Sequence, residues 1–206
     1  LSGSWPNDVK VAIDMSLPEG ADKTLRHCIE NGIALVMGTT GLDPSQQEAI
    51  QRAAERIPVI YGTNMGVGMN VLFALVGKVA AMLGEDYDIE IIEQHHRFKK
   101  DAPSGTALKL ARAAAEGLRR DLDEVGVYGR HGMTGERTAH EIGIHAVRAG
   151  DIVGEHTVLF GALGEHVELR HIAHSRDTFA RGALRAAHFV AGKRPGMYGM
   201  EDVLGL

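Results

Sequence analysis

The chain has 206 residues, of which 44% are hydrophobic and 24% charged, and its net charge is −5. This composition is typical of a globular protein, and the negative charge disfavours a general nucleic-acid-binding surface. The one cysteine, Cys28, excludes an internal disulfide and makes a reducing cytoplasm the expected compartment. We expect neither a signal peptide nor a membrane span, because the most apolar segment (residues 65–83) contains Asn70 and Lys78.

The first third of the chain alternates short apolar strands with helices. Strands are expected at residues 9–14, 33–37 and 58–61. A helix from Pro18 to Asn31 separates the first two strands, and Asp43 with Gln46 marks the start of the next helix as a capping box. Because helices connect the strands, the sequence predicts a parallel sheet of the Rossmann type.

The remainder has a different order of elements. A long helix (65–83) leads to a strand (87–94), a polar loop and a helix from Ser104 to about residue 120. Three strands without intervening helices are expected at 141–147, 155–160 and 167–173, a pattern that favours a mixed or antiparallel sheet. The predicted fold class is therefore α/β: a partial Rossmann-type parallel sheet plus an α+β domain with a mixed sheet.

A last helix is expected from Ser175 to just before Pro195. Its apolar face is predicted from residues at helical spacing, namely Phe179, Ala183, Leu184, Ala187 and Val190. Arg176 stands at the start of this helix and can reach a ligand or solvent; solvent is the simpler interpretation. The segment 148–151 (Arg-Ala-Gly-Asp) is most simply explained as a hairpin turn.

The strongest local pattern is the run from Glu93 to Leu108, which combines a cationic patch with a helix start. The patch consists of His95, His96, Arg97, Lys99 and Lys100. Behind it, Ser104 is a good N-cap, and Gly105 lets a ligand approach the first N–H groups of the helix. The two parts together suit an anion with two separated charges, such as a small dicarboxylate. The alternative is a solvated basic loop before an ordinary capped helix.

His95 and Lys99 are candidate proton donors within this run. An imidazole exchanges protons near neutral pH, which suits general acid–base catalysis. Metal binding by His95 and His96 is the competing interpretation. Adjacent strand residues point to opposite faces, and no cysteine or further histidine lies nearby at zinc spacing, so we expect no metal.

Two polar turns follow predicted parallel strands, where open α/β sheets bind ligands. The segment 38–41 (Gly-Thr-Thr-Gly) offers hydroxyl and N–H groups, and it can also be a plain loop between a strand and a helix. In the segment 62–68, Asn64 can present a donor and an acceptor to an amide such as a nicotinamide carboxamide. The simpler alternative is that Thr63 or Asn64 caps the following helix.

The run His95-His96-Arg97-x-Lys99-x-Asp101-Ala102-Pro103-Ser104-Gly105-Thr106-Ala107 resembles the signature of the dihydrodipicolinate reductase family. Further similar motifs follow the family's order, at residues 13–19, 38–41, 64–68, 148–156 and 175–180. The similarity extends over nearly the whole chain. It implies a reductase of diaminopimelate and lysine biosynthesis that uses NADPH or NADH to reduce 4-hydroxy-tetrahydrodipicolinate.

The resemblance also implies roles for individual residues. His95 would be the general acid/base, and Lys99 would be the proton donor beside it. The substrate-binding residues would be His96, Ser104, Gly105, Thr106 and Thr40. The residues that contact the nicotinamide cofactor would be Gly38, Thr39, Thr40, Gly62, Thr63, Asn64, Met65 and Arg176.

The family implies a two-domain organisation as well. We expect a dinucleotide-binding domain from residues 1–65 and 177–206, and a substrate-binding and oligomerisation domain from residues 66–176. The implied partners are a small dicarboxylate substrate and further copies of the chain in a homotetramer, without nucleic acid or membrane. The expected location is the cytoplasm.

The sequence departs from the family at its beginning. The family opens with a strand and a glycine-rich turn that cradles the cofactor pyrophosphate, and this chain contains no Gly-x-Gly-x-x-Gly. We therefore expect the family's first segment to be missing. Two other hypotheses stay open: a truncated, catalytically silent paralogue that binds a small dicarboxylate or a protein partner, and an unrelated α/β oxidoreductase with the same two-domain plan.

Overall fold

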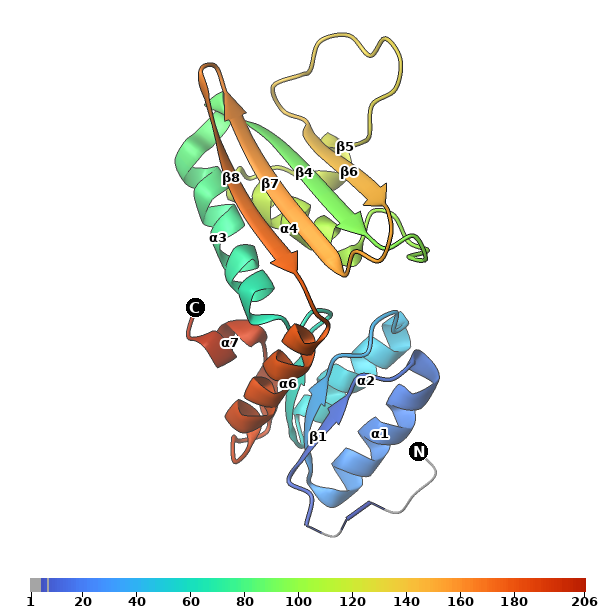
Figure 1. Ribbon diagram of the computed structural model, residues 1–206. Coiled ribbons are helices and arrows are strands. Elements are labelled where there is room, and N and C mark those ends of the chain that lie inside the picture. The colour runs from blue at the N-terminus through green and yellow to red at the C-terminus, as the bar shows by residue number, and fades with distance from the viewer. Residues whose placement is uncertain (1–4, 7) are drawn as a thin grey trace. The chain divides into compact units, whose positions relative to one another are not determined.

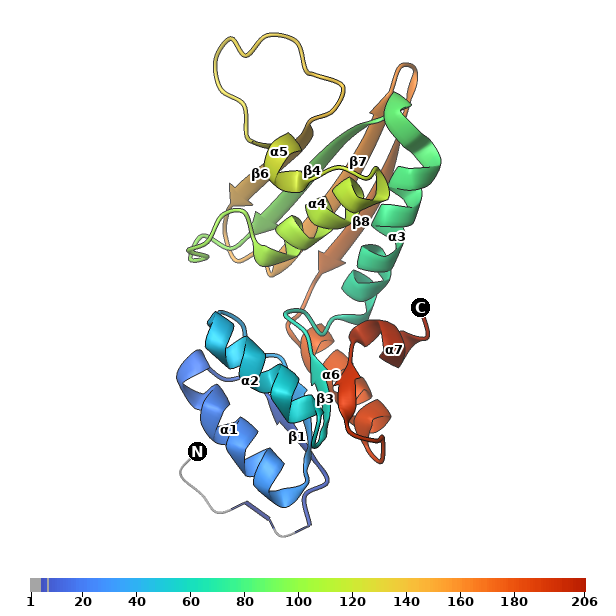
Figure 2. The same ribbon diagram turned by 180° about the vertical axis from the view of Figure 1, so that it is seen from behind.

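The computed structural model describes residues 5, 6 and 8–206, which form two compact units. Unit 1 contains the described residues up to Asn70 together with Asp177–Leu206, and unit 2 contains Val71–Arg176. Each unit has its own sheet (Figures 1 and 2). A parallel sheet in unit 1 and a mixed sheet in unit 2 confirm the predicted fold class. The functional domain boundaries at residues 65 and 176 stay a prediction.

Unit 1 is built on a four-stranded parallel sheet with the strand order β1-β2-β3-β9. Its strands are β1 (Val11–Asp14), β2 (Ala34–Met37), β3 (Pro58–Tyr61) and β9 (Gly196–Tyr198). Its helices are α1 (Pro18–Asn31), α2 (Pro44–Ala54), α6 (Asp177–Val190), α7 (Met200–Leu204) and the start of α3 (Val67–Leu83). The predicted strands and helices are confirmed to within about two residues, except that α6 ends at Val190, about four residues earlier than expected. The short β9 and α7 were not predicted.

Side chains of successive strand residues in unit 1 point to opposite faces of the sheet, and this produces two apolar cores. Leu35 and Met37 of β2 pack with α1 and α2, whereas Val36 between them packs with α6 on the other face. The start of α2 is as predicted, since the Asp43 side chain accepts the Gln46 N–H at 2.9 Å and the capping box is complete. Every strand residue of β2 is buried, as expected for a parallel strand covered on both sides.

The apolar face of α6 differs from the prediction in one residue. Leu184 is 55% exposed, whereas Ala186 is fully buried in its place. Helix α6 passes so close to the segment before α3 that a Cβ on Gly182 would collide with the carbonyl oxygen of Met65. This close approach admits only small residues at the centre of the face, and the bulky Leu184 lies to its side.

Unit 2 is built on a five-stranded mixed sheet with the order β5-β6-β4-β7-β8. Strand β4 pairs in parallel with β6 and antiparallel with β7. The strands are β4 (Asp88–His95), β5 (Gly126–Tyr128), β6 (Ile142–Arg148), β7 (Gly154–Ala162) and β8 (Glu165–Ala173). The helices are the rest of α3, the 3-10 turn η1 (Gly84–Asp86), α4 (Gly105–Gly117) and α5 (Leu122–Val125).

The position of β4 in this sheet corrects one expectation. Because β4 lies between β6 and β7, the segment 148–151 crosses the end of β4 and is not a hairpin turn. The Ala149 N–H donates to the carbonyl of His95 at 2.9 Å, and the Arg97 N–H donates to the carbonyl of Gly150 at 3.1 Å. The segment is therefore tied to the cationic run that follows β4.

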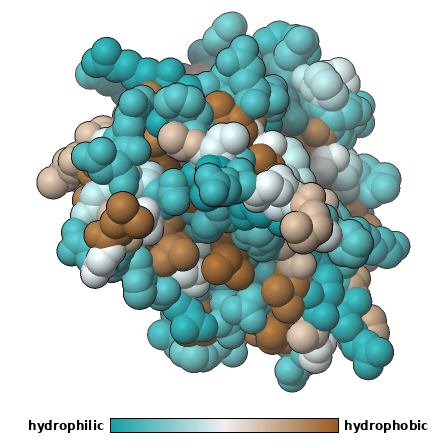
Figure 3. All heavy atoms as spheres, turned by 90° about the horizontal axis from the view of Figure 1, so that it is seen from above, coloured by the Kyte–Doolittle hydropathy of each residue, from teal (hydrophilic) through white to brown (hydrophobic). Residues whose placement is uncertain are grey.

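Helices cover one face of the unit 2 sheet. Helix α4 lies along this face (Figure 2), and it meets α3 so closely that a Cβ on Gly77 would lie 2.8 Å from the carbonyl oxygen of Ala113. Over the opposite face, the loop 129–141 reaches the sheet through Arg130 and Arg137, which bind Glu90. Seen from the end that carries this loop, polar side chains cover most of the surface, with scattered apolar ones between them (Figure 3).

Helix α3 also corrects an expectation. By length and composition alone, residues 67–86 are apolar enough to cross a membrane, although we expected no such segment. Core helices of globular proteins pass the same test. The side chains of Leu72, Phe73, Val76 and Ala80 are buried, and α3 packs against α4 through Gly77. It is a packed helix of this fold.

Candidate active site

The cationic run lies where β4 ends and α4 begins, and both of these elements belong to unit 2. His95 is the last residue of β4, and Gly105 is the first residue of α4. The Ser104 hydroxyl oxygen accepts the N–H of Ala107 at 3.2 Å, which confirms Ser104 as the N-cap. Strand β4 thus delivers the histidines, and the capped helix delivers the N–H groups of its first turn, which have no acceptor within the helix.

Glu93 is the centre of this region, and its side chain is wholly inaccessible to solvent. Its Oε2 atom lies 2.5 Å from Nδ1 of His95 and accepts a bond from Nη1 of Arg148 at 2.9 Å. Its Oε1 atom accepts bonds from Nη2 of Arg148 at 2.8 Å and from the N–H of Ser104 at 3.0 Å. One buried carboxylate therefore joins β4, β6 and the start of α4.

Hydrogen bonding keeps this buried carboxylate charged. Burial by itself would raise the pKa of Glu93, but the bonds from His95, Arg148 and the Ser104 N–H lower that pKa to about 2. In return, the Glu93 carboxylate raises the pKa of the Arg148 guanidinium. The pair is ionised over the whole physiological range.

The other side of the His95 ring lies against strand β7. His156 meets His95 edge to face, with 5.1 Å between the ring centroids. Burial lowers the pKa of His156 to about 3, so this second imidazole is neutral, and its Nε2 lies 3.3 Å from the Ser104 hydroxyl. Gly154 lies beside the second ring nitrogen of His95, Nε2. A Cβ atom at residue 154 would stand 3.1 Å from this nitrogen. Only a residue without a side chain leaves this nitrogen uncrowded.

The remaining predicted residues of the run lie around this centre. Lys99 forms an ion pair with Asp101, with 2.9 Å between Nζ and Oδ1. His96 is half-buried, and its Nδ1 atom is buried without a hydrogen-bond partner. Gly105 is exposed, with open space where a side chain would stand, and Thr106 is half-buried beside it. The structure thus brings His95, Lys99 and the helix start onto one side of unit 2.

Sequence reasoning missed Glu93, Arg148 and His156. Glu93 had a detectable signal, because residues two apart on a strand share a face, and a carboxylate two residues before a candidate acid/base histidine can orient it. Arg148 and His156 had no local signal. They reach the site only because β6 and β7 flank β4 in the sheet.

Apart from Arg176, the predicted cofactor residues lie in unit 1, at the carboxyl ends of its strands. The Gly38 N–H donates to the carbonyl of Asp14 at 2.8 Å, and the Gly62 N–H donates to the carbonyl of Met37 at 3.1 Å. These bonds place the turns after β1, β2 and β3 next to one another. Thr40 and Thr63 are exposed there, while Gly38, Gly62 and Asn64 are half-buried.

Asp14 organises these turns from inside unit 1. Its Oδ1 atom accepts the hydroxyl of the buried Thr39 at 2.8 Å, and the N–H and hydroxyl of Ser16 at 2.9 and 2.7 Å. Burial raises the pKa of Asp14, but hydrogen bonds from Thr24, Ser16 and Thr39 outweigh it and lower the pKa. The Thr39 hydroxyl therefore has a structural role in holding two turns together.

Asn64 closes the turn that leads into α3. Its Oδ1 atom accepts the Gly66 N–H at 2.8 Å, and its carbonyl accepts the amide of Asn70 at 2.9 Å. Because α3 begins at Val67, this bond lies before the helix, so capping by Thr63 or Asn64 and contact with a cofactor both stay predictions. Met65 is buried, and Arg176 is exposed directly before α6, as the last residue of unit 2.

These turns fit the nicotinamide half of a dinucleotide. They combine exposed hydroxyls, glycines that keep the backbone accessible and an asparagine amide, at the strand ends where such cofactors bind. The orphaned Oδ2 atom of Asp14, which is buried without a hydrogen-bond partner, lies at the same edge. After β1 the chain continues Met-Ser-Leu-Pro rather than with a glycine-rich turn, so these residues do not fit the pyrophosphate in the usual way.

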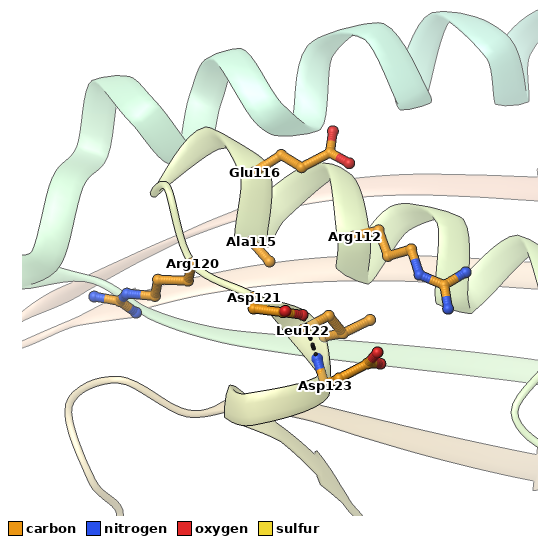
Figure 4. A pocket seen from close by; sticks show the side chains of 7 residues that line it. All are labelled: Arg112, Ala115, Glu116, Arg120, Asp121, Leu122 and Asp123. Carbon is orange, nitrogen blue, oxygen red and sulfur yellow. Dashed lines mark hydrogen bonds between the residues drawn. The ribbon is translucent and has the colours of Figure 1, made fainter.

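Pockets also lie outside the cationic run. A hollow of about 320 Å³ in unit 1 lies beside the turn after β1 and is lined by Trp5, Ile13, Asp14, Met15, Ser16, Gly20, Lys23 and Thr24. A shallow pocket of about 430 Å³ in unit 2 lies between α4 and α5, where arginine and carboxylate side chains alternate (Figure 4). It contains none of the predicted site residues. Among the described residues, no group of three histidine, cysteine or carboxylate side chains could hold a metal ion.

Comparison with known proteins agrees with this arrangement. Residues 3–65 match the family described as dihydrodipicolinate reductase, N-terminus, and residues 68–204 match its C-terminus. The 4-hydroxy-tetrahydrodipicolinate reductase of Syntrophus aciditrophicus is 54% identical over 95% of this chain and 73% of the relative. That of Syntrophobacter fumaroxidans is 54% identical over 96% of this chain and 74% of the relative.

A solved structure is similar as well. The dipicolinate-bound dihydrodipicolinate reductase from Paenisporosarcina sp. TG-14 is 27% identical, with a TM-score of 0.71 over 92% of this chain and 71% of the other. The chain matches both halves of the family, and its sequence identity to the Syntrophus and Syntrophobacter relatives exceeds 50% over most of its length. The hypothesis of an unrelated α/β oxidoreductase is therefore excluded. The chain belongs to the dihydrodipicolinate reductase family, whose members are NAD(P)H-dependent reductases of diaminopimelate and lysine biosynthesis.

Proposed function

We propose that this chain reduces 4-hydroxy-tetrahydrodipicolinate and that His95 supplies the proton of the reaction through its Nε2 atom. The observation that supports this role is the environment of the His95 ring. Its Nδ1 atom is engaged by the buried Glu93, and its Nε2 atom lies beside Gly154, where no side chain crowds it. A fixed imidazole with one accessible nitrogen is what a general acid requires.

The dicarboxylate substrate is assigned to the surroundings of His95. The solved relative was obtained with dipicolinate bound, and dipicolinate carries two carboxylates on one ring. In this chain, Lys99 and His96 offer cationic or donor groups, and Gly105 and Thr106 lie in the first turn of α4, where the helix favours anions. Ser104 supports this end as the helix cap, and Thr40 of unit 1 is assigned to the same substrate.

The residues suit the charge changes of the reduction. When bound, the nicotinamide cofactor supplies a hydride to the conjugated C=C–C=N system of the substrate. The electron pair displaced by that addition moves along the conjugation, and the resulting anion takes one proton from the His95 imidazolium. The neutral His95 then regains a proton from solvent, and the Lys99 ammonium stabilises the anion in the meantime.

The cofactor is assigned to the turns of unit 1. The Asn64 amide and the backbone of residues 38–40 and 62–65 would hold the nicotinamide carboxamide and its ribose, and Arg176 would reach the same ligand. Thr39 acts indirectly, because its hydroxyl is bonded to Asp14. We assign no residue of this chain to the adenosine end of the cofactor.

We further propose that the chain acts in the cytoplasm as a homotetramer. The face of the unit 2 sheet opposite α4 supports assembly, because Val147 and Ile172 stand on it with 41% and 37% of their surface exposed. The loop 129–141 reaches that face through Arg130 and Arg137. Sedimentation at micromolar concentration tests the assembly, and a monomer would contradict it.

A single substitution tests the role of His95. In His95→Gln, kcat should fall by about 10²- to 10⁴-fold, since that is the usual contribution of general acid catalysis. The inhibition constant of dipicolinate should change little, because its carboxylates are bound by other groups. Initial rates of NADPH and NADH oxidation measure both quantities. Equal losses in kcat and in dipicolinate binding would contradict a proton-transfer role.

A further inference from the structure

We propose that Glu93 is a positioning residue, which fixes the neutral His95 ring in the tautomer with the proton on Nδ1 and so makes Nε2 the atom that exchanges protons. This inference rests on the proposed role of His95 as the proton donor. Glu93 itself is wholly buried and has no contact with solvent. Its influence is exerted through the bond to Nδ1 of His95.

The tautomer follows from what a carboxylate can do. An ionised carboxylate only accepts hydrogen bonds, so the 2.5 Å contact requires a proton on Nδ1 of His95. A ring that has delivered its proton from Nε2 is left in this same tautomer. The arrangement of the free enzyme therefore matches the state that proton delivery produces, and no ring rotation or proton exchange is needed after the step.

Glu93 can hold the ring because it is itself held. Arg148 binds both carboxylate oxygens, and the Ser104 N–H binds Oε1 from the start of α4. A two-pronged guanidinium contact fixes the plane of the carboxylate as well as its position. The orientation of His95 is thus set by β6 and α4 together, rather than by its own strand.

The other titratable groups of this region do not compete with Glu93 for Nδ1. His156 on β7 is in ring contact with His95, His171 on β8 pairs with His156, and Lys99 and Asp101 form an ion pair with each other in the loop. His156 is neutral and lies edge-on to the ring, and burial lowers the pKa of His171 as well. Of these neighbours, only Glu93 is hydrogen-bonded to a His95 ring nitrogen.

Replacing the carboxylate by an amide should invert the tautomer. In Glu93→Gln, the position of Oε1 faces two groups that can only donate, the Ser104 N–H and Nη2 of Arg148. The amide oxygen takes that position, because an NH2 group there would meet two donors, whereas at Oε2 it meets one, Nη1 of Arg148. This orientation turns the NH2 group toward Nδ1 of His95. Nδ1 then has to accept, and the proton of the neutral ring moves to Nε2.

Nitrogen-15 NMR of the histidine-labelled chain reads this change directly. In the unmodified protein, the neutral form of His95 should show a protonated Nδ1 and a bare Nε2; in Glu93→Gln, the assignment should be reversed. The variant should also lose on the order of 10²-fold or more in kcat with little change in KM. The acid-requiring limb of its pH–rate profile should move to lower pH, because the imidazolium has lost its counter-charge.

The matched control is Glu90→Gln. Glu90 lies on the same strand and also binds arginine and histidine side chains, but it faces the opposite side of the sheet. Its substitution should leave the His95 tautomer and kcat unchanged. Should Glu93→Gln fail to fold, the double variant Glu93→Gln/Arg148→Met removes the uncompensated guanidinium and carries the same expectation, because the Ser104 N–H still orients the amide.

The outcomes separate this inference from the proposed function. An unchanged His95 tautomer in the folded variant would overturn the positioning role. A reversed tautomer with an unchanged kcat would confirm that Glu93 orients the ring and would instead contradict His95 as the proton donor. A fall in kcat that Glu90→Gln reproduces would also overturn the inference, because the effect would then not be specific to the Glu93 side of the strand.

Discussion

Two glutamates of strand β4 gather the same kinds of partner on opposite faces of the sheet. Glu93 binds Arg148 and His95, whereas Glu90 binds Arg130, Arg137 and His145. Their pKa values are both lowered to about 2, since hydrogen bonds outweigh the effect of burial. The two sites nevertheless differ in exposure, in the number of arginines and in which histidine nitrogen is engaged.

These differences give the two glutamates different roles: Glu90 attaches a loop to the sheet, whereas Glu93 orients the proposed proton donor. At Glu90, whose side chain is 15% exposed, the two arginines come from the loop 129–141, and His145 is engaged through Nε2. The cluster fastens that loop to the sheet. At Glu93, which is 0% exposed, His95 is engaged through Nδ1 and keeps Nε2 available beside Gly154. The same residue types therefore have different roles, set by which ring nitrogen stays accessible.

The largest difference should appear on removing an arginine from each cluster. Arg148→Met leaves Glu93 as a buried charge without its cation, and we expect a loss of about 3–5 kcal/mol in the free energy of unfolding. Arg130→Met should lose less than about 1 kcal/mol, because Arg137 still binds Glu90 near solvent. Urea unfolding at neutral pH measures both values. Similar losses in the two variants would contradict the distinction between the clusters.

Acid should affect the two clusters over the same pH range. A carboxylate whose pKa falls from 4.5 to about 2 on folding stabilises the protein fully above pH 4.5, and this contribution is lost as the pH falls toward 2. Each contribution amounts to at most about 3 kcal/mol. We expect Glu93→Gln to remove more of this pH dependence than Glu90→Gln, because water screens the partly exposed Glu90. Unfolding free energies measured between pH 6 and pH 2 test the difference.

The smallest effects concern two glycines next to the clusters. In Gly154→Ala, the new Cβ would stand 3.1 Å from Nε2 of His95, so kcat should fall by up to about 10²-fold with little loss of stability. In Gly143→Ala, the Cβ would collide with the Glu90 carboxylate, so stability should fall by about 1–3 kcal/mol with kcat unchanged. Steady-state rates and thermal unfolding of both variants give the comparison. A loss of activity in Gly143→Ala alone would reverse our assignment of the two faces.

Much of the fold could be predicted because its signals are local. Pro18, the capping box at Asp43 and the cap at Ser104 are set by neighbouring residues, and each lies where it was predicted. The β4 histidines and the helix start behind them also form one continuous run. The family resemblance followed from that run, because its residues are close together in the sequence and can be recognised without knowing how the strands pair.

The partners of His95 could not be predicted in the same way. Arg148 follows Glu93 by 55 positions, and the segment after it has the composition of an ordinary turn. Leu184 likewise has helical spacing, but the close approach of α6 to Met65 gives the buried position to Ala186. Periodicity along one element carries no information about how closely its neighbours approach.

By itself, then, the sequence determined the element order, the helix caps and the chemical character of the cationic run. The tertiary structure decided which ring nitrogen of His95 is accessible, that Arg148 binds a buried carboxylate, and that His156 stays neutral beside it. The physical reason is that hydrogen bonding and burial depend on strands that pair across the sheet. Those pairings join residues far apart in the chain, and only folding brings them together.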